Sequence, residues 1–188
     1  TAVTEDLRNV LEEHSGMDLH HFFERWIYGE YYPIYHITSS YFHTDNGTSL
    51  ISVGIDQTQQ SPPFWMPVDI RIQSTEGVFN FVAHNTEDPQ EFSFVVNGVP
   101  TIIQADPDNW ILSEVNSEFL QFMGHVLPGD LNNDGTQDVL DVVRVINIII
   151  DPSSITPFMS WIGDLNTDGI LDVLDIVSLV SIIVNISP

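Results

Sequence analysis

The chain has 188 residues, 43% of them hydrophobic, which is enough for one or two domains with buried cores. Its 27 acidic residues are set against four arginines and no lysine, so the formal net charge is −23. Such a charge argues against nucleic acids and anionic membranes as partners. Because cysteine is absent, a disulfide framework and thiol catalysis are excluded.

The first thirty residues predict two helices. Thr4 supplies a capping residue before an acidic first turn, and Gly16 ends the first helix. A second helix is expected from about Asp18 until Gly29 and Pro33 close it. Both segments carry apolar residues at helical spacing, which are Leu7, Val10 and Leu11 in the first and Leu19, Phe22, Phe23, Trp26 and Ile27 in the second.

From Tyr35 onward the hydrophobic period changes to two, which is typical of strands. Asn46-Gly47, Glu76-Gly77 and Asn97-Gly98 mark turns between them. Strands are predicted at about 35–42, 48–56, 66–73, 78–83, 91–96, 101–105 and 110–115. Short strands at this spacing predict an all-β, immunoglobulin-like sandwich.

Two copies of one acidic loop lie near the C-terminus, DLNNDGTQDVLD over 130–141 and DLNTDGILDVLD over 164–175. Oxygen-bearing side chains recur at loop positions 1, 3, 5 and 12, and a glycine permits the sharp turn at position 6. A main-chain carbonyl is available at position 7. These are the requirements of a hard cation that takes six to eight oxygen ligands, so the sequence predicts two Ca²⁺ ions, one for each loop.

Each predicted calcium site uses the same set of loop positions. We expect direct ligation by the side chains of Asp130, Asn132, Asp134 and Asp141 with the Thr136 carbonyl, and by those of Asp164, Asn166, Asp168 and Asp175 with the Ile170 carbonyl. Asp138 and Asp172 are expected to act through water.

The residues around the loops differ from those of a true EF-hand, which needs a helix on both sides of the loop. Pro128-Gly129 precedes the first loop and Pro157 precedes the second, so no long helix is expected before either. An apolar helical run follows each loop. Residues 129–185 therefore resemble a dockerin, a small all-α module with duplicated EF-hand-like calcium loops that binds a cohesin domain on another protein.

Two positions depart from the cellulosomal dockerin pattern. Loop position 8 is usually apolar but is Gln137 in the first copy. Positions 10 and 11, usually polar and selective for the partner, are Val139-Leu140 and Val173-Leu174. We therefore expect these four residues to form the partner-binding face, for a cohesin-like protein whose identity stays open. The chain's own sandwich is the alternative surface for covering apolar stripes of the two helices.

Residues 1–116 resemble the end of the catalytic domain and the following β-sandwich of the alanyl aminopeptidase family of zinc metallopeptidases. The resemblance lies in LHHFFERWIYGEYYP over 19–33, QTQQ over 57–60, FWMPVDIR over 64–71 and DPDNWIL over 106–112. That family holds zinc and activates water with an HExxH motif and a downstream glutamate. HExxH does not occur here, so the chain as given is not expected to be an enzyme, and any zinc belongs to an upstream catalytic part.

The predicted fold class is therefore multidomain. Residues 1–33 would be the helical end of a metallopeptidase catalytic domain, 34–116 the sandwich, 117–128 a short linker, and 129–188 the dockerin. The predicted function is calcium-dependent attachment of a secreted bacterial or archaeal metallopeptidase, extracellular or at the cell surface. The rival reading is a stand-alone adhesion or scaffold module with a ligand-binding sandwich, in which calcium is purely structural.

Overall fold

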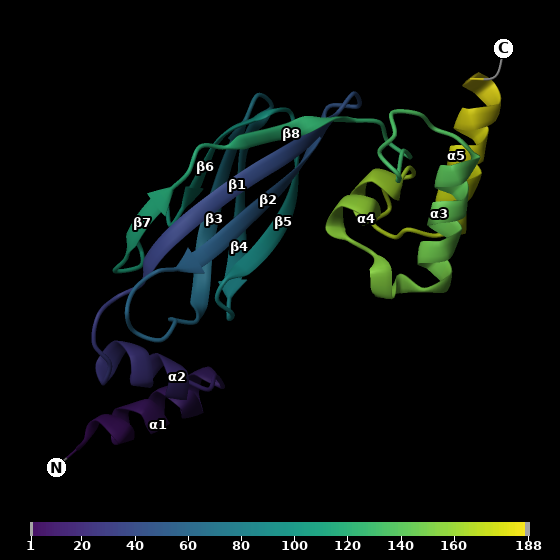
Figure 1. The fold of residues 1–188 in the computed structure, drawn as a ribbon. Helices are drawn as coiled ribbons and strands as arrows, with labels where there is room; N and C mark the ends of the chain where they lie inside the picture. The colour runs from purple at the N-terminus through teal and green to yellow at the C-terminus, as the bar shows by residue number, and fades with distance from the viewer. Residues whose placement is uncertain (1, 187–188) are drawn as a thin grey trace.

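A computed structural model describes residues 2–186 of the chain (Figure 1). It begins with helix α1, Thr4–Ser15, whose N-cap is Val3, and Gly16 ends the helix with a φ of 68°. The main-chain N–H of Val3 donates to the Asp6 carboxylate over 2.8 Å. Helix α2, His20–Phe22, continues directly into a π-helical turn, Phe23–Ile27.

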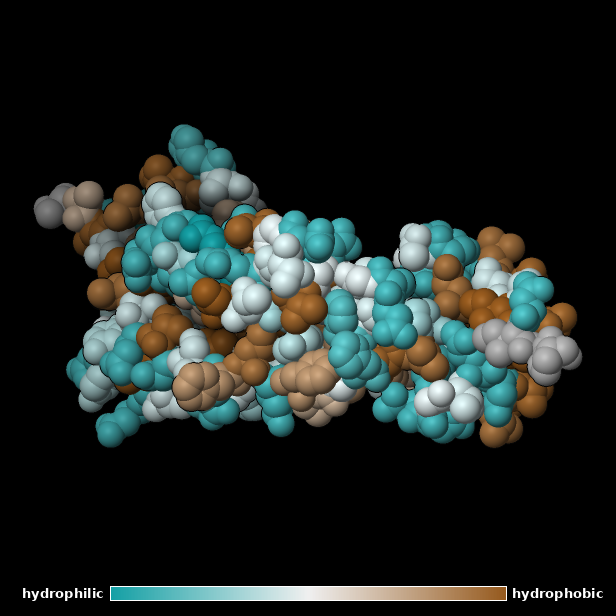
Figure 2. Space-filling model, turned by 90° about the horizontal axis from the view of Figure 1, so that it is seen from above, coloured by the Kyte–Doolittle hydropathy of each residue, from teal (hydrophilic) through white to brown (hydrophobic). Residues whose placement is uncertain are grey.

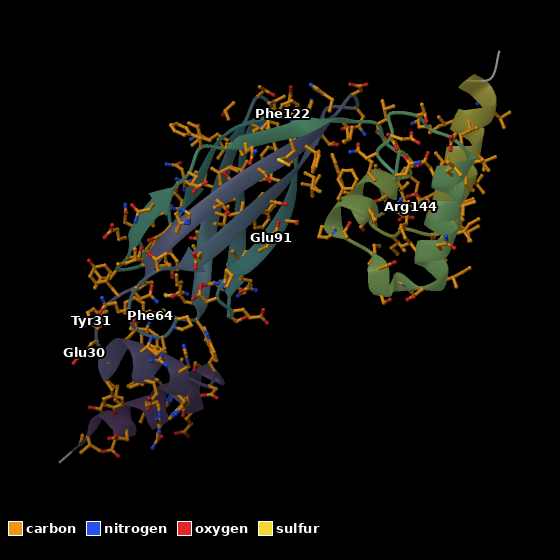
Figure 3. The ribbon with its side chains drawn as sticks, viewed as in Figure 1. Glu30, Tyr31, Phe64, Glu91, Phe122 and Arg144 are labelled. Atoms are coloured by element: carbon orange, nitrogen blue, oxygen red, sulfur yellow. The ribbon has the colours of Figure 1, made fainter. Side chains whose placement is uncertain are left out.

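No residue of helix α1 is buried against the rest of residues 2–186. The N-cap Val3 and the helix residues Leu7, Val10 and Leu11 are 42–56% exposed, and this leaves one face of an amphipathic helix in water. The π-helical turn is better packed. Trp26 lies 4.8 Å from the ring of buried Phe64, which lies where the N-terminal helices meet the strands (Figure 3).

Eight strands follow, and they form two sheets (Figure 1). Their bounds are β1 Ile34–Thr44, β2 Thr48–Gln57, β3 Met66–Ser74, β4 Gly77–Asn85, β5 Gln90–Asn97, β6 Pro100–Ala105, β7 Glu114–Ser117 and β8 Gln121–Val126. The larger sheet has the order β5-β2-β1-β7, with β8 also paired to β1, and the smaller has the order β4-β3-β6. Strands β7 and β8 run parallel to β1, whereas the other pairings are antiparallel.

The core between the two sheets comes from alternate strand positions. Tyr35 and Ile37 of β1, Ile51 of β2, and Val68 and Ile70 of β3 are all fully or almost fully buried. This is the pattern that the period-two sequence predicts, because successive side chains of a strand point to opposite faces.

The C-terminal part contains α3 Val139–Ile150, a 3₁₀ turn at Pro152–Ser154, α4 Pro157–Gly163 and α5 Val173–Ile186. These helices share a second core with the larger sheet, because Val126 of β8 is buried in the same cluster as Val145, Ile162 and Leu179. The ring of Phe42 on β1 also lies 5.0 Å from that of Phe158 on α4.

The multidomain fold class predicted from the sequence is wrong. The described residues form one mixed α/β unit, mostly strands with five short helices, and not an all-β immunoglobulin-like sandwich followed by a small all-α module. Two features account for the difference. β8 and β1 contribute side chains to the core of the C-terminal helices, and the parallel pairings of β7 and β8 with β1 depart from an antiparallel sandwich.

Two local predictions also differ from the structure. The segment expected to be a linker contains β8, and only the end of the strand expected at 110–115 is strand, in β7. Before the second loop, where no long helix is expected, the structure has the seven-residue helix α4, which begins at Pro157. Proline is compatible with the first turn of a helix because the N–H that it lacks would have no partner within the helix.

The contact of His21 with Trp65, in the segment just before β3, is expected to depend on pH. Its ring stacks on Trp65 at a centroid distance of 3.9 Å, and its Nε2 accepts from the main-chain N–H of Trp65 over 3.3 Å. Burial, followed by the nearby Arg25 charge, lowers the pKa of His21 below its ordinary value of 6.5. Protonation would remove the acceptor, so the unfolded chain binds this proton more readily than the folded one.

We therefore expect the contribution of His21 to stability to be present above about pH 6.5 and to be lost as the pH falls below that value. Urea unfolding of the chain between pH 5 and 8 would measure it. His21→Ala should flatten the curve through this range, whereas His84→Ala, an exposed site on β4, should leave its shape unchanged. An identical pH dependence in His21→Ala would contradict the assignment.

Candidate functional site

The first acidic loop joins β8 to α3, and its carboxylates accept hydrogen bonds from the loop's own main chain. The Asp130 carboxylate accepts from the N–H of Asp134 over 3.1 Å and of Gly135 over 2.8 Å. The Asp134 carboxylate accepts from the Asn132 amide over 2.8 Å, and from the N–H and hydroxyl of Thr136. This network folds the loop main chain around the carboxylates of Asp130 and Asp134.

The last aspartate of the loop ties its two ends together. The carboxylate of Asp141, on α3, accepts from the N–H of Asn132 over 3.2 Å and of Asp138 over 3.0 Å. Asp138 is the N-cap of α3, and its carboxylate accepts from the N–H of Leu140 over 2.7 Å. In the second loop Asp172 accepts from the Leu174 N–H at the same distance. Asp138 and Asp172 therefore start the helices.

The second loop, between α4 and α5, repeats this geometry. The Asp164 carboxylate accepts from the N–H of Asp168 over 3.1 Å and of Gly169 over 2.9 Å. Asp175 accepts from Asp172 over 2.9 Å. The two loop glycines also share a left-handed backbone, with φ values of 88° at Gly135 and 86° at Gly169.

Three of the loop carboxylates are buried without a positive partner. Asp130, Asp141 and Asp175 are at most 1% exposed, and none forms an ion pair with a cationic side chain in the described part of the chain. Arg144, the only arginine or lysine after residue 128, is exposed on α3 (Figure 3). Burial raises the pKa of Asp141, whereas hydrogen bonds from Thr136 and Asn132 lower that of Asp134.

This donor set suits a hard divalent cation. Buried carboxylates are costly without a compensating positive charge, and carboxylate, amide and carbonyl oxygens are the ligands that Ca²⁺ takes. No three His, Cys, Asp or Glu side chains within residues 2–186 come together as a ready-made metal cluster. Each predicted set uses three carboxylates with an Asn side chain and a main-chain carbonyl, so calcium ligation by these sets stays a prediction.

A glycine before each loop locks the two loops together, a feature that the sequence interpretation missed. A Cβ added at Gly129 would lie 2.8 Å from Leu179 Cδ1 and 3.5 Å from Leu165 of the second loop. Reciprocally, one added at Gly163 would lie 3.5 Å from Leu131 of the first loop. The Gly129 N–H also donates to the Ile162 carbonyl over 2.7 Å. The recurrence of Gly and Leu at equivalent positions was the available signal.

The predicted partner face is open in the structure. Val139, Leu140, Val173 and Leu174 are 58–65% exposed. Hydrophobic residues gather on the surface of the C-terminal part in Figure 2. The exposure continues along both helices at equivalent positions, which are Val143, Ile146 and Ile150 in α3 and Val177, Val180 and Val184 in α5. The two near-copies thus expose apolar residues at equivalent positions.

The adjacent histidines of α2 have separate surroundings. His20 Nδ1 lies 3.0 Å from an Arg8 side-chain nitrogen, and its Nε2 lies 3.9 Å from Glu24, whereas His21 stacks on Trp65. They do not converge on one site.

No helix in the described part of the chain has the length and apolar character needed to cross a membrane.

Comparison with known proteins leaves the family of this chain open. No family model matches it, and no curated protein matches it. Among solved structures it is similar to Legionella pneumophila aminopeptidase A in complex with aspartic acid, with a TM-score of 0.46 and 12% identity. The match covers 85% of this chain and 19% of that one, so this chain spans about a fifth of that protein.

The description of the C-terminal residues as a separate, small all-α dockerin unit with EF-hand-like loops is wrong. The helices share a core with β1 and β8, so they are part of a mixed fold. The first loop follows strand β8, and the second follows the short helix α4. Calcium ligation by the residues of the two loops stays a prediction.

Proposed function

We propose that this chain is the non-catalytic C-terminal part of an exported metallopeptidase, and that it attaches the enzyme to a cohesin-like protein. In this proposal the two loops bind one Ca²⁺ ion each and thereby hold α3 and α5 in place. Their shared apolar face then binds the partner. Calcium would supply the positive charge that the loop carboxylates lack, and the carboxylate oxygens would coordinate it.

The observation that carries the proposal is the pairing of the loops with the exposed face. Asp141 and Asp175 are buried at the start of α3 and α5, and the apolar pairs Val139-Leu140 and Val173-Leu174 lie directly before them. Exposed apolar patches of this kind mark interfaces. Ordering the loops therefore also fixes the positions of the four side chains.

The parent enzyme is proposed from the N-terminal segment. The sequence of 19–33 resembles the end of an aminopeptidase catalytic domain, and α1 exposes Leu7, Val10 and Leu11. An upstream domain would cover that face. Millimolar calcium outside cells makes an exported setting the fitting one.

Binding to a panel of cohesin domains, measured by calorimetry with calcium and with chelator, tests the proposal. We expect binding in calcium only. Replacing Val139, Leu140, Val173 and Leu174 by aspartate should weaken it by about 30-fold or more, because central apolar contacts of an interface each contribute about 2 kcal/mol. Circular dichroism of the variant in calcium should match that of the parent chain.

Val82→Asp is the matched control, because Val82 is 49% exposed on β4, away from the proposed face. It should bind as the parent chain does. Binding that persists in chelator, or that survives all four aspartates, would refute attachment through this face.

A further inference from the structure

A cleft of about 700 Å³ lies between the larger sheet and the second loop. One wall is made by β2 and β5, and the other by α4 and the residues after it. Its volume lies within the range of about 300–1,000 Å³ that is usual for ligand sites. None of the four residues of the proposed partner face lines it, so it is a separate feature of the molecule.

Thr44, Asn46 and Thr48 of this cleft bond to one another, whereas three other polar side chains that line it have no hydrogen-bond partner among the described residues. The hydroxyl of Ser93 and the amide of Asn97 project from β5, and the hydroxyl of Thr167 belongs to the second loop. None of these side chains forms a hydrogen bond with another described residue. They offer two hydroxyls and an amide, all neutral groups that both donate and accept.

Apolar surface lies beside these groups. Trp161 of α4 lines the cleft together with Leu50 and Val95 of the sheet. The Trp161 ring is half-buried, and it packs edge-on against Phe158 at a centroid distance of 6.3 Å. A large, supported aromatic side chain next to neutral donors and acceptors suits a ligand that is apolar on one face and hydroxylated at its edges.

The charges of the cleft select against ionic ligands. Among the described residues, no Lys, Arg or His lines it, so an anion would find no cationic side chain there. Its one carboxylate belongs to Asp164, and both oxygens already accept main-chain N–H groups of Asp168 and Gly169. A cationic peptide therefore gains little there. We propose that this cleft binds an uncharged saccharide, with a sugar ring against Trp161 and its hydroxyls bonded to Ser93, Asn97 and Thr167.

Isothermal titration of the calcium-loaded chain with cello-, xylo-, manno-, malto- and chitohexaose tests this assignment. We expect at least one of the five to bind, and the double variant Ser93→Ala with Asn97→Ala to weaken that binding by at least tenfold. Both residues are exposed, so the fold should be unaffected. The control is Ser117→Ala with Asn116→Ala, an exposed pair on β7 outside the cleft.

Trp161→Ala should abolish saccharide binding, whereas Trp110→Ala, 81% exposed and outside the cleft, should retain it. Replacing Val139, Leu140, Val173 and Leu174 by aspartate should also leave saccharide binding unchanged. The saccharide proposal can therefore fail or succeed independently of the proposed partner face. The assignment is overturned if none of the five sugars binds at millimolar concentration, or if binding survives both cleft variants. It is equally overturned if an uncharged Ser-Gly peptide binds in the cleft and the sugars do not.

Discussion

Removing calcium is expected to unfold the helices that follow the two loops. At free calcium about 100 times Kd, each ion contributes about 2.7 kcal/mol to stability, so two contribute about 5.4 kcal/mol. That is comparable with the lower end of the whole stability of a domain, about 5 kcal/mol. Without the ions the buried carboxylates of Asp130, Asp141 and Asp175 have no positive partner.

Circular dichroism and thermal melting of the whole chain, before and after chelation, would measure this effect. The helical signal of α3 and α5 should fall and the thermal midpoint should drop, because these helices share a core with β1 and β8. Restoring calcium should reverse both changes. If chelator leaves the spectrum and the midpoint as they were, calcium has no structural role in the loops.

Asp141→Ala is expected to weaken both calcium sites, although it changes only one loop. Loss of a position-12 carboxylate should lower affinity at the first loop by about 100-fold, equivalent to about 2.8 kcal/mol. The second loop should also weaken, because Gly129 packs on Leu165 and Gly163 packs on Leu131. A loosened first loop therefore removes packing that positions the second.

Calorimetric titration with calcium would show the two sites separately. The matched control is Asp151→Ala, because Asp151 is an exposed aspartate that caps the 3₁₀ turn outside both loops. It should leave both affinities unchanged. One site lost and the other at full affinity in Asp141→Ala would show that the loops act independently.

The parts of the structure that follow from local sequence were predictable. The strands from β1 to β6 match the period-two pattern, since Asn46-Gly47, Glu76-Gly77 and Asn97-Gly98 fix the turns between them. The sharp turn in each loop was also predictable, because a glycine stands at position 6, and Gly135 and Gly169 both have a left-handed backbone there. Helices α3 and α5 begin at their capping aspartates for the same local reason.

The parts that depend on distant contacts were not predictable. β8 pairs in parallel with β1, about eighty residues earlier in the chain. The short sequence of β8 does not indicate which strand it will pair with. The core shared by Val126 and Phe158 follows from this pairing. The predicted fold class was wrong because the pairing was not predicted. The close approach of the two loops at Gly129 and Gly163 was not predictable either. Its only trace in the sequence is that both loops are preceded by a glycine.

The parallel pairing of β8 with β1 determines how the chain bears a pulling force. The N-terminal helices lead into the start of β1, and the second core follows the end of β8, where Thr44 pairs with Val126. Tension between the two termini is therefore directed along the strands in opposite senses. The hydrogen bonds between β1 and β8 are therefore loaded together in shear and do not open one after another. This arrangement resists a force that pulls the two termini apart.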